Sequence, residues 1–250
     1  MIHKENLTES QAGILEMLDS PLAKVMTWTR FPDVFAKRKT TVEGGLLDLW
    51  REMREVDEPA KAGVPLLKLG TFGLVPKVEK GCLRHDANVR KIAGIESDYD
   101  LEVMHPMEAV ERLPRAPIAA LVYTSPSHTP EAPRWRVLCP LSKTYSPDMQ
   151  AGFVARLNGV LDGKLAGEWF ALSQSFYYGS VKGRQPDVWP VDGEFINLLP
   201  DLDRGAVGRG DCPVAAGEKS PDESRSADAI RLALSLRKRG KTEPRDASGR

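Results

Sequence analysis

The chain has 250 residues, 41% of them hydrophobic, so it is long enough to fold around a substantial core. Its 35 basic and 35 acidic residues balance, which argues against a protein that coats nucleic acid with its whole surface but allows a local basic groove. The chain has no apolar run near the roughly 20 residues of a membrane helix and no signal peptide, so we expect a cytoplasmic protein without membrane contact. Its three cysteines lie far apart, so we expect neither a disulfide framework nor a zinc site.

The first third of the chain contains patterns of both helices and strands. Apolar residues at helical spacing predict helices, and short apolar runs predict strands. The first predicted element is a helix that begins at a capping box at residues 8–11 and ends at Pro21. It is followed by a strand at 24–29, a helix at 46–53 and a strand at 66–69.

A strand, helix and strand unit follows in the middle of the chain. The predicted elements are a strand ending at residue 100, a helix initiated by Pro106, a strand at 118–123, a strand at 134–139 between two prolines, a helix at about 147–162 and late strands at 176–178 and 195–196. This mixture predicts an α+β fold whose sheet carries polar functional groups.

The composition changes after Pro200 to small, polar and charged residues. Such a segment buries little apolar surface, so we expect one folded domain over residues 1–200, followed by a linker and a flexible tail over 201–250. Residues 226–238 within the tail have the composition of a short helix.

Three carboxylates alternate along the strand that ends at residue 100. Side chains two residues apart on a strand share a face, so Glu96, Asp98 and Asp100 would form a ladder while Ile95 and Tyr99 point the other way. Crowded carboxylates favour a hard divalent cation, which prefers oxygen ligands. The alternative is a solvated strand edge or an Asp-rich turn.

A second polar cluster follows the strand at 118–123. The sequence Thr124-Ser-Pro-Ser-His128 brings hydroxyls and an imidazole to a strand end, where they can donate to phosphate oxygens. Arg134 and Arg136 share a face of the next strand and can bind a triphosphate or a template backbone. The alternatives are a loop histidine without a chemical role and an exposed strand face.

In this order, the motifs GIESDYD at 94–100, YTSPSH at 123–128 and PRWRVLCPLS at 133–142 resemble the archaeo-eukaryotic primase superfamily. The resemblance covers roughly residues 65–180 and is strongest to the primase-polymerase domains of plasmid and phage replication proteins. It implies a primase-like catalytic core with an RRM-like sheet within residues 1–200. It also implies that Asp98 and Asp100 bind catalytic Mg²⁺ or Mn²⁺ and that His128 contacts the phosphates of the incoming nucleotide.

The resemblance extends to further residues. It implies a third acidic residue downstream, for which Glu168 is the candidate and Asp162 the alternative. The family often has a serine two residues before the histidine, where this chain has a proline, so Ser127 or Ser125 would supply the hydroxyl. We therefore expect Ser127, His128, Arg134 and Arg136 to bind nucleotide.

An upstream segment also resembles close relatives of this family. By this likeness Arg84, His85 and Asn88 would line the same cleft. The alternative is a turn whose Asp and Asn side chains bond their own backbone.

The expected reaction is template-dependent transfer of a nucleotide to a 3′-hydroxyl or to a starting nucleotide. Its partners would be a DNA template, nucleoside triphosphates and a replicative helicase acting in cis or in trans. Two other functions stay open, a metal-dependent nuclease and a non-catalytic DNA-binding replication initiator. Retention of both aspartates and the histidine argues against the initiator, because concentrated negative charge opposes DNA binding.

Overall fold

The computed structural model describes residues 19–165 and 170–208. The capping box at 8–11, Glu168 and the predicted helix at 226–238 lie outside the described residues. All of the described residues belong to one compact unit. Within the described ranges, no helix has the length and apolar character needed to span a membrane.

The described part of the chain contains strands, three longer helices and several short 3-10 helices. The strands are β1 (Met26–Phe31), β2 (Thr40–Gly44), β3 (Asp57–Glu58), β4 (Leu66–Lys68), β5 (Gly70–Phe72), β6 (Val89–Tyr99), β7 (Ala120–Thr124), β8 (Trp135–Tyr145), β9 (Phe176–Tyr177), β10 (Ser180–Val181) and β11 (Val188–Val191). The longer helices are α2 (Leu46–Glu55), α3 (Pro106–Arg115) and α4 (Gln150–Val160), and the 3-10 helices are Pro21–Ala23, Lys61–Gly63, Asp86–Asn88, Pro147–Met149, Ile196–Leu198 and Pro200–Gly205.

The central sheet has five strands in the order β11-β7-β8-β6-β5, and each neighbouring pair is antiparallel. Because β6 and β7 are both antiparallel to β8, they run parallel to each other with β8 between them. Helix α3 connects β6 to β7, so these elements form a split β-α-β unit. The predicted α+β fold is confirmed.

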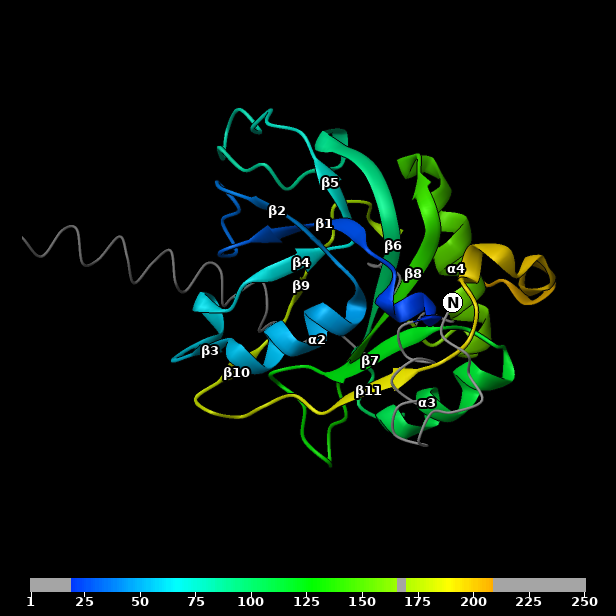
Figure 1. Ribbon diagram of the computed structural model, residues 1–250. Helices are drawn as coiled ribbons and strands as arrows, with labels where there is room; N and C mark the ends of the chain where they lie inside the picture. The colour runs from blue at the N-terminus through cyan, green and yellow to red at the C-terminus, as the bar shows by residue number, and fades with distance from the viewer. Residues whose placement is uncertain (1–18, 166–169, 209–250) are drawn as a thin grey trace, which may run out of the picture. The chain divides into compact units, whose positions relative to one another are not determined.

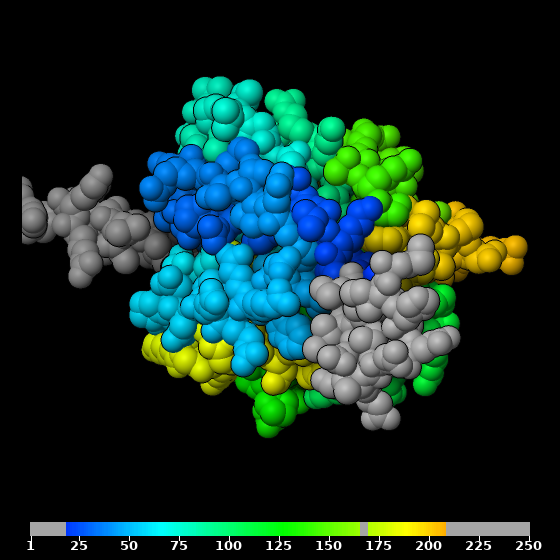
Figure 2. Space-filling view, viewed as in Figure 1, coloured from blue at the N-terminus to red at the C-terminus, as the bar shows by residue number. Residues whose placement is uncertain are grey.

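The two faces of the central sheet are covered differently (Figure 1). Helices α3 and α4 pack on one face through Leu113, Phe153 and Leu157. A second antiparallel sheet, in the order β2-β1-β4-β9, covers the other face together with α2. Figure 2 shows β1, β2 and α2, coloured in shades of blue, over a large part of the molecular surface in this view. Side chains of β6 and β8 that point to this second face therefore lie between the two β-sheets.

The structure corrects two of the predicted strands. Strand β8 continues through Pro140 to Tyr145. Pro140 pairs with Gly94 beside an irregularity in the β6 register, where a missing backbone N–H is tolerated. The predicted strand at 195–196 is wrong, because Ile196 begins a 3-10 helix and its side chain is buried in the core.

Strand β11 was missed by the sequence prediction because it contains Pro190. It is an edge strand that pairs only with β7. A proline is tolerated on an edge strand because its missing N–H does not remove a hydrogen bond from the sheet.

Residues 201–208, which the sequence prediction assigns to the linker, lie against α4. Arg156 binds Asp203 through two N–O contacts of 2.7 and 2.9 Å. Val207 N donates to Ala155 O over 3.0 Å. A Cβ at Gly159 would lie 1.9 Å from the carbonyl oxygen of Gly205, so this close approach requires glycine.

These contacts predict where the chain can be shortened. A chain ending after residue 208 should melt at the same temperature as the full chain. A chain ending after residue 199 should melt several degrees lower, because it loses the segment that covers α4. Thermal unfolding followed by circular dichroism measures both. Equal melting temperatures for the two shortened chains would contradict the prediction.

Candidate active site

Asp98, Asp100, His128 and Arg136 lie at one edge of the central sheet. Strands β6 and β7 run parallel, so their carboxyl ends lie at the same edge. Asp98 is the register partner of Arg136 on β8, and Arg136 is the partner of Tyr123 on β7. These three side chains lie side by side on the face that the second sheet covers. Ile95 and Tyr99 are buried in the opposite core, as the alternation predicted.

Asp98 and Arg136 form a buried ion pair. Arg136 Nη2 lies 3.4 Å from Asp98 Oδ2, and the two residues are only 6% and 4% exposed. Arg136 Nη1 also donates to Tyr177 O over 2.8 Å. Burial lowers the pKa of Arg136, but the negative charges of Asp98 and Asp100 outweigh this effect, so the pKa lies above its ordinary value. Arg136 is therefore a fixed cation beside Asp98 and does not lie on an exposed strand face.

Asp98 and Asp100 offer carboxylate oxygens, the ligand type that a divalent metal ion prefers. Asp100 directly follows β6, and its charge acts on the same Arg136 as that of Asp98. Mg²⁺ is commonly bound by one or two carboxylates together with water and substrate phosphates. Among the described residues, no three His, Cys, Asp or Glu side chains gather into a metal site of their own. The expected third ligand, Glu168, lies outside the described residues.

Glu96 is paired inside the protein instead. Its Oε2 lies 2.7 Å from Lys68 Nζ, and its Oε1 accepts from the backbone N–H of Leu69. Lys68 Nζ also donates to Gln150 Oε1 over 2.9 Å. Burial raises the pKa of Glu96, and the charge of Lys68 opposes this rise. The expected ladder of three carboxylates is thus divided into a structural glutamate and two aspartates at the site.

The Lys68–Glu96 pair gives a prediction about stability. Lys68→Met should destabilise the fold by about 3–5 kcal/mol, because it leaves a carboxylate without its cation in a site where both side chains are at most 1% exposed. Adding Glu96→Gln should restore much of this loss. Urea unfolding of the two variants and the wild type measures the difference. A double variant no more stable than Lys68→Met would contradict the structural role.

His128 lies in the loop between β7 and β8. The backbone N–H of Arg134 donates to His128 Nδ1 over 3.1 Å, so the neutral ring carries its proton on Nε2. Burial lowers the pKa of His128, and the neighbouring His105, whose ring centroid is 6.5 Å away, lowers it further. At neutral pH, His128 is therefore an uncharged ring with one N–H available for donation.

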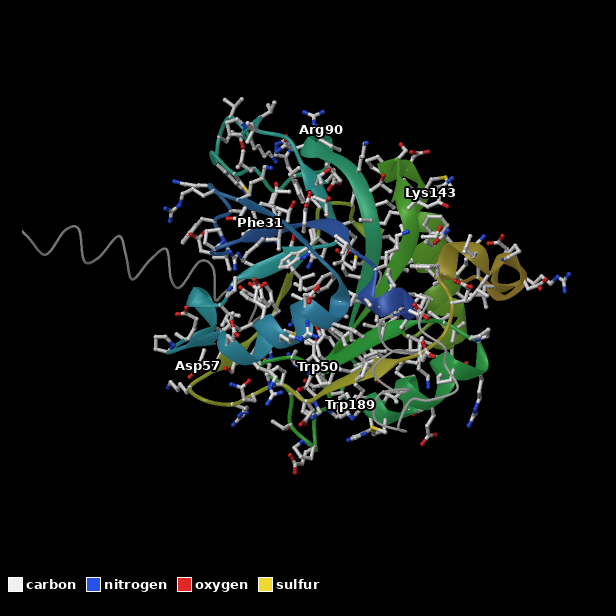
Figure 3. All side chains as sticks on the ribbon, viewed as in Figure 1. Phe31, Trp50, Asp57, Arg90, Lys143 and Trp189 are labelled. Atoms are coloured by element: carbon white, nitrogen blue, oxygen red, sulfur yellow. The ribbon has the colours of Figure 1, made fainter. Side chains whose placement is uncertain are left out.

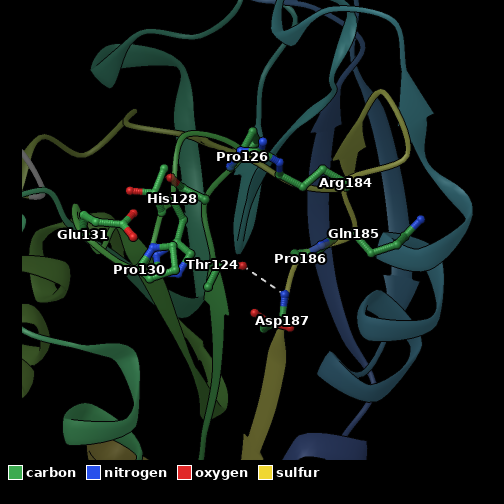
Figure 4. Close-up of a pocket in the computed structure, with 12 residues that line it drawn as sticks. Thr124, Pro126, His128, Pro130, Glu131, Arg184, Gln185, Pro186 and Asp187 are labelled. Atoms are coloured by element: carbon green, nitrogen blue, oxygen red, sulfur yellow. Dashed lines mark hydrogen bonds between the residues drawn. The ribbon is translucent and has the colours of Figure 1, made fainter.

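A pocket of about 440 Å³ adjoins His128 (Figure 4). The β7–β8 loop forms one wall, and residues 184–187, which precede β11, form another. Asp187 N donates to Thr124 Oγ1 over 2.9 Å, which joins the two walls. Figure 4 shows the side chain of Arg184 extending toward Pro126 across the pocket. The sequence analysis did not identify Arg184, because it lies in a polar loop with no motif.

Ser127 and Arg134 have different surroundings at this edge. Ser127 Oγ accepts from Lys61 Nζ over 3.4 Å, and Lys61 Nζ also lies 5.3 Å from the centre of the Tyr177 ring. The guanidinium of Arg134 binds Glu102, with Nε 2.9 Å from Oε1. Lys61, like Arg184, was missed by the sequence analysis, since it reaches the site from a 3-10 helix far away in the chain.

The upstream segment organises a loop at the opposite end of β6. Asn88 is fully buried, and its amide donates to Leu83 O over 2.7 Å and to Gly73 O over 3.1 Å. Arg84 and His85 lie near Val34 O and Val75 O. The Asn88 contacts agree with the turn that the sequence left as an alternative, whereas Asp86 accepts from Ser173 N in a distant segment.

No protein-family model and no curated protein sequence matches the chain. Three solved structures are similar to it. The AEP domain of the primase-polymerase of cyanophage S-2L has 12% identity and a TM-score of 0.40, with 76% of this chain and 95% of that chain covered. The primase RepB′ has 11% identity and a TM-score of 0.39, with 90% and 68% covered.

The third structure is the polymerase domain of Mycobacterium tuberculosis ligase D in complex with DNA, with 14% identity, a TM-score of 0.32 and 79% and 83% covered. At these identities the likeness concerns the fold alone. The resemblance to the archaeo-eukaryotic primase superfamily rests on the sequence motifs at 94–100, 123–128 and 133–142.

Proposed function

We propose that this chain is a metal-dependent nucleotidyltransferase of the primase-polymerase kind, acting in plasmid or phage DNA replication. It would transfer a nucleotide from a nucleoside triphosphate to a 3′-hydroxyl, or to a starting nucleotide, on a DNA template. The observation that carries the proposal is the buried Asp98–Arg136 pair, which lies at the same sheet edge as Asp100 and the neutral imidazole of His128.

Asp98 and Asp100 would hold Mg²⁺ or Mn²⁺, with Glu168 as the proposed third ligand. The ion would neutralise charge on the phosphates and activate the attacking hydroxyl. Arg136 keeps the two carboxylates next to a fixed positive charge, so they need not repel each other strongly.

The polar groups around the pocket suit a triphosphate. His128 would donate from Nε2 to a phosphate oxygen without adding a permanent charge. Arg184, which lines the pocket together with the acidic Glu131 and Asp187, would supply positive charge, and Lys61, held near Ser127, would add to it from outside the lining. Arg136 and Arg134 are the other guanidiniums of the proposed site. Positioning and charge neutralisation would therefore provide most of the catalysis, without a covalent intermediate.

Two other functions use some of the same groups. A metal-dependent nuclease would use the aspartates but has no need for a pocket that holds a free triphosphate. A non-catalytic replication initiator would bind DNA at this site. The negative charge of the carboxylates would repel the DNA phosphates and so oppose that binding. We prefer the transferase because His128, which lines the pocket, lies at the same end of the central sheet as the two aspartates.

The test is an incubation of the full chain with labelled nucleotides, primed and unprimed DNA templates and Mg²⁺ or Mn²⁺. We expect product that lengthens only when a template is present. Shortened template strands would indicate a nuclease. A mobility shift without any change in strand length would indicate an initiator, and either result would overturn the proposal. A helicase added to the same reaction tests that proposed partner separately.

A further inference from the structure

We propose that two neighbouring loops at the end of β6 farthest from Asp98 bind the double-stranded part of a primed template. The loops are residues 32–39, between β1 and β2, and residues 73–88, between β5 and β6. We call the exposed lysines and arginines of these loops and of the start of β6 the basic loop surface. It consists of Lys37, Arg38, Lys77, Lys80, Arg90 and Lys91. The inference rests on the proposed function for the identity of the DNA.

The first argument is a local excess of positive charge. The whole chain is balanced, but residues 32–39 and 73–91 contain eight Lys and Arg side chains against three Asp and Glu. Two of the three acidic side chains bind backbone amides: Asp33 accepts from Phe35 N over 2.9 Å, and Asp86 accepts from Ser173 N over 2.9 Å. A local net charge of this sign on a neutral protein attracts a polyanion such as DNA.

The second argument is that the loops are organised. Leu83 N donates to Ala36 O over 2.9 Å, which joins the two loops within their length. Asn88 closes the longer loop through its side-chain amide, and Val75 N donates to its Oδ1 over 3.3 Å. A binding surface that is already ordered loses less conformational entropy when a ligand binds.

The third argument is the exposure of apolar side chains on these ordered loops. Phe35, Leu74, Val75 and Val78 are 46%, 78%, 59% and 99% exposed. Proteins that bind duplex DNA often place apolar side chains against sugars or base edges, with lysines and arginines beside them on the phosphates. The basic loop surface provides both kinds of group together.

The fourth argument is the position of the surface. Figures 1 and 2 show the two loops side by side at one end of the molecule, and Figure 3 shows Arg90 extending outward there. Strand β6 connects Arg90 to Asp98, and its eight residue steps span about 26 Å at about 3.3 Å each. This is the length of about eight base pairs of duplex at about 3.4 Å each. The loops would therefore contact primed duplex about one helical turn from the reacting end.

The experiment measures DNA binding separately from catalysis. The full chain is titrated in EDTA, without nucleotide, against fluorescent hairpins that share one overhang and have stems of about 5 or about 16 base pairs, and anisotropy is followed over a range of salt. We expect the long stem to bind at least about tenfold more tightly than the short stem at low salt. The triple variant Arg38→Gln, Lys77→Gln, Lys80→Gln should lose this difference and lower the magnitude of the log–log salt slope by about 2–3.

The matched control neutralises three exposed arginines outside both loops, Arg51→Gln, Arg115→Gln and Arg204→Gln. It should bind both stems like the wild type. Equal losses in the two triple variants, or an unchanged salt slope in the loop variant, would overturn the inference. Loss of binding to anionic lipid vesicles without loss of DNA binding would also overturn it and indicate a membrane surface. None of these binding measurements requires the chain to incorporate a nucleotide. A chain that binds duplex through this surface but adds no nucleotide would therefore contradict only the proposed function.

Discussion

Asp98→Asn should lower nucleotide incorporation by at least about 100-fold, because it removes one of the two carboxylates proposed to hold the metal ion. Asp100→Asn should have a similar effect on the same reaction. Single-turnover incorporation on a primed template, at saturating Mg²⁺ and again with Mn²⁺, measures both variants. Normal incorporation by both would rule out the assigned metal ligands.

The two variants should differ in stability. Asp98→Asn removes the charge that faces Arg136 in a buried site, so the fold should lose about 1–3 kcal/mol. The loss is limited because an amide oxygen can still accept from Arg136 and because Arg136 also donates to Tyr177 O. Asp100→Asn should change stability little, since Asp100 is only partly buried. Asp201→Asn, at an exposed ion pair, is the control for both assays.

His128→Asn should raise the Michaelis constant for nucleotide and lower turnover, with a combined loss of about 10- to 150-fold in kcat/KM. The asparagine oxygen can take the place of Nδ1 and accept from Arg134 N, so the loop keeps its shape while the proposed phosphate donor at Nε2 is lost. Binding of template without nucleotide should be unchanged.

His128→Gln is the matched variant, because its amide nitrogen reaches the position of Nε2. It should keep more of the nucleotide affinity than His128→Asn. If His128→Asn keeps normal nucleotide kinetics and only the melting temperature falls, His128 is a packing residue. His105→Ala, which removes the neighbouring ring, controls for a general disturbance of this region.

The parts of the site that the sequence predicted are polar residues that lie on, or directly after, a strand with a clear hydrophobic pattern. Asp98 lies on the long strand β6, and Arg136 alternates with the buried Trp135, so strand periodicity alone predicted their faces. His128 could be placed because it follows the fully buried strand β7 within a few residues. Local patterns of this kind need no knowledge of the tertiary structure.

The parts that the sequence missed depend on contacts between distant segments. The partner of Glu96 is Lys68, on a different sheet, and no local pattern links the two. Lys61 reaches the site from a short 3-10 helix and Arg184 from a polar loop, and neither segment has a motif that marks it in the sequence. The extension of β8 past Pro140 depends on an irregularity in its neighbour β6, which only the paired structure reveals.

The strand order has a consequence for synthesis on the ribosome. Strand β4 pairs with β9, and β7 pairs with β11, so the four-stranded and the five-stranded sheet each receive an outer strand from the last part of the described chain. While residues 176–191 are still inside the exit tunnel, the nascent polypeptide exposes unpaired backbone on both sheets, and such edges promote aggregation. Slow translation of the C-terminal region would prolong this exposure, so soluble yield in cells should depend on codon choice in that region more than on codon choice near the start.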